Sequence, residues 1–207
     1  PLLVAALAAD VLIAAIVVGL IDADWFSMAN AKRAGSATIL PVLVLLLVNV
    51  IPAPLRDRLG HLRWTNPLPG NRAFTKYGPQ DDRIDMDALE RALGPLPTTA
   101  KEQNALWYKL YKEVGNEVSV FESQKRYLLF RDLAAMSFML LVATPSLAIT
   151  FDWQVVGWIA LMFMLQTVLC AVTSRNTGIR FVANVLVLHS AKDEHKSKDI
   201  KTAAKAR

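Results

Sequence analysis

Cysteine and histidine are scarce: the 207 residues contain one cysteine and three histidines. A single cysteine, Cys170, cannot form an internal disulfide, and a Cys-rich zinc site cannot be built from it. The sequence also lacks a phosphate-cradling glycine loop, a His-Glu-x-x-His pattern and a nucleophile elbow. We therefore expect no metal, no cofactor and no catalytic residues.

Charge is missing from two neighbouring stretches, residues 133–151 and 153–174, which are separated only by Asp152. Each stretch is close to the roughly 20 apolar residues that a helix needs to cross a bilayer. Because backbone polar groups cannot stay unpaired in hydrocarbon, both stretches should be helices joined by a tight hairpin at Asp152. Within the first of them Pro145 should kink the helix.

Two further apolar runs precede this hairpin in a chain whose mean hydropathy is +0.32. Residues 1–21 carry a single charge, Asp10, and residues 34–55 carry none. A cleaved signal peptide is the alternative for the first run, but no basic residue precedes its apolar stretch. We predict four transmembrane helices in residues 1–55 and 133–174.

The stretch between the second and third spans, residues 56–132, mixes acidic and basic residues and should face water. Its first third is turn-rich and is predicted to be an ordered loop. A short helix should follow from Asp85 to a stop at Gly94, and a second over residues 100–114, where Thr99 and Glu102 form a capping box. The predicted fold is all-α: a polytopic membrane protein with a cytoplasmic helical insert.

Both long helices of the hairpin should continue out of the bilayer. One extends back from residue 133 toward Val118, and the other continues past Ser174 through residues 175–188, where its apolar face needs a cover. The Lys-rich end, residues 192–207, is expected to be frayed or disordered. Residues 175–207 thus form a helix extension with a basic tail.

The basic residues predict the orientation of the chain in the membrane. Four spans place nearly all of the 23 Lys and Arg residues on one side, which the positive-inside rule makes the cytoplasm, together with both termini. We expect an integral protein of the plasma membrane, or of the inner membrane of a bacterium. The basic residues expected at the membrane surface are Arg56, Arg58, Lys125, Arg126, Arg131, Arg175 and Arg180.

Three polar residues fall at membrane depth, namely Asp10, Asn49 and Gln166. Ionisable groups in a span are costly and raise the possibility of function. Asp10 is either packed inside the bundle with hydrogen-bonding partners, or involved in ion conduction or proton movement, or slid toward an interface.

The insert holds the residues that we expect to dock a protein partner. Near its beginning they are His61, Arg63, Trp64, Arg72 and Tyr77, and on its second predicted helix they are Trp107, Tyr108 and Tyr111. The aromatic residues of that helix can instead be core. The cluster from His61 to Asp85, which includes paired carboxylates, has two other interpretations: acid–base or metal chemistry, or an ordinary solvated loop.

The architecture favours a non-enzymatic membrane platform or effector subunit that forms homo-oligomers and docks a cytosolic protein through its insert. The analogy, at the level of layout only, is with small four-span sensors and effectors of bacterial defence systems. An ion channel or pore lined by the intramembrane polar residues is one alternative, and a membrane-bound enzyme using His61 to Asp85 is another. Direct nucleic-acid binding is not expected, since the basic tail should contact lipid headgroups.

Overall fold

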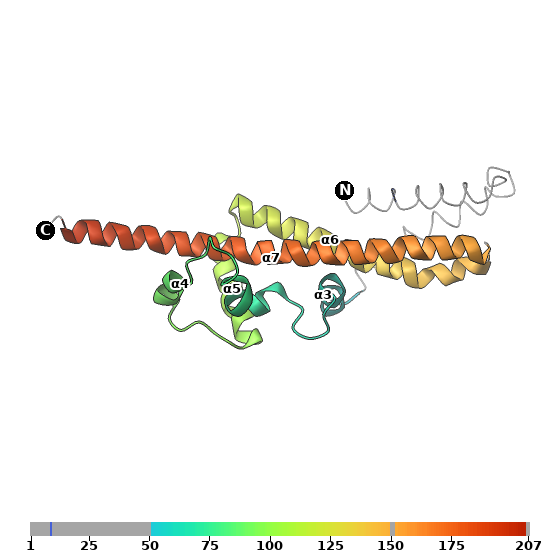
Figure 1. Cartoon of the computed structure of the whole chain (residues 1–207), viewed down its shortest axis with the longest axis horizontal. Helices are drawn as coiled ribbons and strands as arrows, with labels where there is room; N and C mark the ends of the chain where they lie inside the picture. The colour runs from blue at the N-terminus through green and yellow to red at the C-terminus, as the bar shows by residue number, and fades with distance from the viewer. Residues whose placement is uncertain (1–8, 10–50, 150–151, 206–207) are drawn as a thin grey trace. The chain divides into compact units, whose positions relative to one another are not determined.

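The computed structural model describes residues 51–149 and 152–205, together with Ala9. The regular elements among these residues are helical, with no strand between them (Figure 1). The all-α prediction is therefore confirmed for the described residues. Asp10, Asn49 and nearly all of the first two predicted spans lie outside them. The elements are α3 (Ala53–His61), η2 (Pro69–Arg72), η3 (Ala73–Tyr77), α4 (Met86–Leu93), α5 (Ala100–Val114), α6 (Val118–Ala143), η4 (Thr144–Ile149) and α7 (Trp153–Lys205).

The chain divides into two compact units. We call residues 1–62 and 129–174 the apolar unit, and residues 63–128 and 175–207 the aromatic unit. Helices α6 and α7 each contribute residues to both units. The predicted division into four segments by membrane location stays a prediction.

Two helices are long and apolar enough to cross a membrane. They are Val118–Ser146, with a mean hydropathy of 1.5, and Trp153–Ala191, with a mean hydropathy of 2.2. Both helices extend beyond their uncharged stretches, as predicted. Helix α6 begins well before Leu133, and α7 continues past Ser174. The prediction of a disordered tail is wrong as far as Lys205, because the sequence after Gly178 contains no glycine or proline and is rich in the good helix formers Ala and Lys.

Pro145 ends α6 instead of kinking it. The α-helix stops at Ala143, and η4 continues as a tighter 3-10 turn. Proline has no N–H to donate to the carbonyl four residues earlier. Thr144 Oγ1 donates to Leu140 O at 2.8 Å and Ser146 Oγ to Ala143 O at 2.7 Å, so hydroxyl groups satisfy carbonyls at this helix end. That residues 133–151 cross the membrane stays a prediction.

In the apolar unit, α6 and α7 pack along each other over a hydrophobic cluster (Figure 1). The buried residues of this core are Ile51, Ala135, Met136, Leu140, Val155, Ile159 and Phe163. The opposite face of α7 is different, because large apolar side chains stay exposed there. Trp158 is 53% exposed and Leu169 is 66% exposed.

The aromatic unit is organised around Phe181 of α7. Its ring centroid lies 5.0 Å from that of Trp107 and 5.3 Å from that of Tyr111, both edge-on, and 6.3 Å from that of Tyr127. Edge-to-face pairs add to the free energy gained from burial. The apolar face of α7 beyond Ser174 is thus covered by α5 and by the beginning of α6, and Trp107 is core.

The helices of this unit begin where the sequence predicts. Asp85 caps α4 by accepting a hydrogen bond from Ala88 N at 2.8 Å, and Gly94 ends it with φ +81°, a left-handed conformation that glycine adopts without strain. Thr99 caps α5, and its hydroxyl also donates to Glu102 Oε2 at 2.6 Å. Both predicted helices are confirmed.

The segment before α4 departs from the predicted loop, because it winds into the short turns η2 and η3. The buried Gln103 of α5 explains the arrangement. Its Oε1 accepts from Phe74 N at 3.1 Å and from Thr75 N at 3.2 Å, and its Nε2 donates to Thr98 O at 2.8 Å. The Gln103 side chain therefore accepts hydrogen bonds from two backbone N–H groups that in a longer helix would donate to backbone carbonyls.

Gly70→Ala should destabilise the aromatic unit, because a Cβ there would lie 2.5 Å from Asn104 Oδ1 and 2.7 Å from Trp107 Cε3. We expect a loss of about 1–3 kcal/mol in the free energy of unfolding, measured by denaturant unfolding in detergent. Gly157→Ala is the control, since a Cβ there meets nothing within 4 Å. Equal stability of the two variants would show that η2 does not need its close approach to α5.

Candidate functional site

Of the three polar residues predicted to lie at membrane depth, Gln166 alone is among those described. It lies on α7 and is partly buried. Its neighbour Thr167 is buried, and the Thr167 hydroxyl donates to Phe163 O at 2.7 Å within the same helix. Such a bond satisfies the hydroxyl within its own helix, without a partner helix.

The residues predicted to dock a partner differ in how far their side chains are exposed. His61, Tyr77 and Trp107 are buried. Arg63, Arg72 and Tyr111 are partly buried. Trp64 is 74% exposed and Tyr108 is 49% exposed, so these two aromatic side chains are the ones available to a partner. Tyr108 also carries the ammonium group of Lys112 over its ring, 5.2 Å from the centroid.

Two of the three carboxylates between His61 and Asp85, those of Asp81 and Asp85, have structural partners. Asp85 caps α4, and Asp81 forms a two-point ion pair with Arg83, with Nε–Oδ1 at 2.9 Å and Nη2–Oδ2 at 2.7 Å. Hydrogen bonding to Arg83 lowers the pKa of Asp81, and the same bonds raise the pKa of Arg83. His61 belongs to the apolar unit, whereas the carboxylates belong to the aromatic unit. Among residues 51–149 and 152–205, no group of three or more His, Cys, Asp or Glu side chains could hold a metal ion.

An ionic cluster in the apolar unit was not foreseen from the sequence. Arg131 Nη1 lies 3.1 Å from Asp57 Oδ1, and Arg131 Nη2 lies 2.9 Å from Asp132 Oδ1. Arg56 Nη1 approaches the same Asp132 oxygen at 3.5 Å. The four side chains are only 11–20% exposed. Arg56 and Arg131, predicted as membrane-surface cations, are thus engaged with carboxylates.

Gly60 makes this cluster possible, because it lets α3 lie directly on the residues around it. A Cβ at Gly60 would be 2.8 Å from Arg131 Cγ and 3.1 Å from Ser174 Oγ. A side chain there would push α3 away from α6 and lengthen the Asp57–Arg131 contact. The only local sign of this packing in the sequence is a glycine one helical turn after Asp57. Arg131, the partner of Asp57, lies 74 residues away in the chain.

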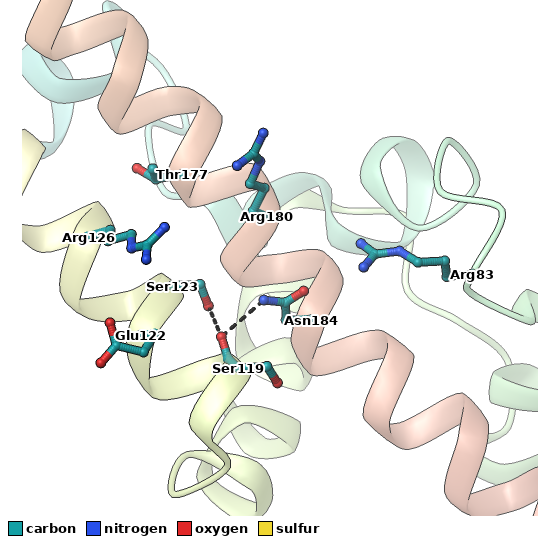
Figure 2. A pocket seen from close by; sticks show the side chains of 8 residues that line it. All are labelled: Arg83, Ser119, Glu122, Ser123, Arg126, Thr177, Arg180 and Asn184. Atoms are coloured by element: carbon teal, nitrogen blue, oxygen red, sulfur yellow. Dashed lines mark hydrogen bonds between the residues drawn. The ribbon is translucent and has the colours of Figure 1, made fainter.

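The other predicted surface cations, Arg58, Lys125, Arg126, Arg175 and Arg180, are exposed. Two of them border a hollow of about 390 Å³ in the aromatic unit, which we call the α6–α7 pocket. Helix α6 contributes Ser119, Glu122, Ser123 and Arg126 to its lining. Helix α7 contributes Thr177, Arg180 and Asn184, and Arg83 approaches from the loop before α4 (Figure 2).

Two hydrogen bonds converge on one carbonyl beside the α6–α7 pocket. Asn184 Nδ2 donates to Ser119 O at 3.1 Å, and Ser123 Oγ donates to the same carbonyl at 2.8 Å (Figure 2). Because one bond joins α7 to the first turn of α6, the two walls are fixed to each other. The sequence shows that Arg126 and Arg180 are basic. It does not show that they line one pocket, because they lie about 55 positions apart in the chain.

His189 is a buried member of the same unit. Its Nε2 lies 3.0 Å from Leu110 O, and a carbonyl only accepts, so Nε2 carries the proton. The contact ties α7 to α5 and leaves no role for this nitrogen as a ligand.

No protein family, curated protein sequence or solved structure matches the chain. Fold and site together define a helical protein with two helices long and apolar enough to cross a membrane. The function has to be argued from these residues.

Arg131→Ala should destabilise the protein by about 2–4 kcal/mol, because Asp57 would lose its contact with Arg131 and Asp132 would keep only the longer contact with Arg56. Arg58→Ala removes the same charge from an exposed position beside the cluster and should change stability by less than about 0.5 kcal/mol. Thermal unfolding of both variants in detergent compares them. Equal melting temperatures for Arg131→Ala and the unmutated protein would contradict a stabilising role of the cluster.

Proposed function

We propose that the protein is a non-enzymatic integral membrane platform or effector subunit with four transmembrane helices. Its aromatic unit lies in the cytoplasm and docks a soluble protein, and the chain forms homo-oligomers in the bilayer. The proposal combines membrane insertion, orientation and docking, and each has its own support.

Membrane insertion is supported by one observation above all, the exposed apolar stripe of α7. Trp158, Leu161, Leu165, Val168 and Val172 recur every three or four residues and are 38–54% exposed. This spacing puts them on one helix face. A soluble protein rarely leaves such a contiguous apolar surface uncovered, whereas lipid chains or neighbouring membrane helices cover it at no cost.

The orientation is supported by where the cations lie along the helices. The stripe ends at Val172, and the exposed Arg175 and Arg180 follow on α7, while Lys125 and Arg126 precede the apolar stretch of α6. Cations beside the ends of spans favour the cytoplasmic side. Both predicted spans thus have their basic ends in, or next to, the aromatic unit, which makes that unit cytoplasmic.

Docking is supported by the contrast between a closed core and an open surface in the aromatic unit. Phe181, Trp107 and their neighbours fill the interior, so the unit needs no partner to complete its core. Trp64 and Tyr108 nevertheless remain exposed. Exposed Trp and Tyr are the side chains that most often contribute large binding energies at interfaces.

Leu165→Arg should impair membrane integration, since an arginine near the middle of a span costs about 2.5–3.5 kcal/mol. The measurement is the fraction of protein that stays with membranes after alkaline carbonate extraction. Val118→Arg is the control, because Val118 is 77% exposed in the aromatic unit and should tolerate the charge. Release of the unmutated protein by carbonate would rule out membrane insertion.

Replacing Trp64 and Tyr108 together by alanine should abolish retention of a stoichiometric soluble protein on the purified, detergent-solubilised chain. Lys101→Ala and Lys109→Ala change exposed residues of α5 without removing an aromatic side chain and should leave retention unchanged. The complex should also form again from the separated components. If the double alanine variant retains the same protein equally well, docking does not use these residues.

A further inference from the structure

The α6–α7 pocket contains two cations without a counter-ion. Among the described residues, Arg126 and Arg180 form no ion pair, whereas Arg83 is paired with Asp81. The single acidic residue of the lining is Glu122. Two unpaired guanidinium groups against one carboxylate leave the pocket basic, and like charges held close together favour an anion between them.

The donors of the pocket suit one class of anion. A guanidinium group presents its N–H donors in a planar fork that matches phosphate oxygens. Arg126 comes from α6 and Arg180 from α7, so the two forks are carried by different helices (Figure 2). Asn184 uses one amide N–H for Ser119 O and keeps a second to donate. The lining thus offers donors to an oxyanion from both helices.

The size of the pocket indicates that the anion belongs to a larger molecule. About 390 Å³ falls within the roughly 300–1,000 Å³ of typical small-molecule sites, and a bare phosphate ion fills only a fraction of it. We propose that the α6–α7 pocket binds a phosphate group carried by a larger organic molecule, held by Arg126, Arg180 and Asn184.

Two sources of this phosphate are consistent with the pocket. Arg180 lies six residues after Ser174, or about 9 Å farther along α7, where lipid headgroups would be if the stripe is in the bilayer. The pocket is equally open to a soluble phosphate compound from the cytosol. Only the lipid source depends on the proposed membrane insertion. Carbonate extraction tests that insertion separately from phosphate binding.

The experiment uses the full chain in dodecyl maltoside, a detergent without phosphate. One arm follows the melting temperature during titration with pyrophosphate at constant ionic strength, with chloride as the comparison. The other arm counts bound phosphatidylglycerol by native mass spectrometry, with diacylglycerol as the lipid lacking phosphate. Binding in the first arm identifies a soluble source and binding in the second a lipid headgroup, and either supports the phosphate site.

Matched variants separate the pocket from general electrostatic attraction. Arg126→Ala with Arg180→Ala should weaken binding at least about tenfold, because both forks are lost. Lys125→Ala with Arg175→Ala removes the same charge from adjacent exposed positions outside the lining and should retain nearly full binding. Glu122→Gln should strengthen binding, since it removes the one opposing charge.

The proposal is overturned if neither pyrophosphate nor phosphatidylglycerol binds. It is also overturned if both double variants lose binding equally, because the attraction would then be a property of the whole basic surface. All four mutated cations are exposed, so the double variants should keep the melting temperature of the unmutated protein without ligand.

Discussion

One helix, α7, has an apolar surface that is exposed along one stretch and covered by protein along the next, and this difference explains most of the structure. Between Trp158 and Val172, α7 packs on α6 with one face and exposes large apolar side chains on the other. Beyond Ser174 the apolar face is covered by protein instead, with Phe181 surrounded by Trp107, Tyr111 and Tyr127. Without a cover of lipid the Trp158–Val172 stretch would aggregate, and without α5 the stretch beyond Ser174 would do so as well.

In each unit a few polar side chains hold neighbouring elements together. In the apolar unit Arg131 binds two carboxylates, and Gly60 gives α3 the room to approach it. In the aromatic unit Gln103 closes the turns of η2 and η3, and His189 joins α7 to α5. Arg126 and Arg180 serve neither core, and unlike the other exposed cations of α6 and α7 they line a pocket. This combination makes the α6–α7 pocket a candidate for ligand binding.

The sequence predicts the local features of this fold and misses those that depend on distant pairs. Caps at Asp85 and Thr99 were readable, because the signals lie within four residues of each other, and so was the continuation of both long helices. The Arg131–Asp57 pair joins residues 74 positions apart, and nothing local distinguishes Arg131 from the exposed Arg58. Pro145 shows where the regular helical hydrogen bonding is interrupted. Whether a proline kinks or ends a helix depends on what the chain packs against next. The sequence predicts Arg126 and Arg180 as surface cations, but nothing in it indicates that they line the same pocket.

The most direct test of the account is a spin-label scan along α7 in liposomes, starting from a Cys170→Ala background. The collision rate of each label with oxygen, which concentrates in lipid, is compared with that of a polar nickel chelate. The account predicts preference for oxygen at Leu161, Leu165, Val168 and Val172, and for the chelate at Arg175 and Asn176. Equal access of the chelate to the stripe and to Arg175 would show that no lipid covers the stripe, and membrane insertion of α7 would be contradicted.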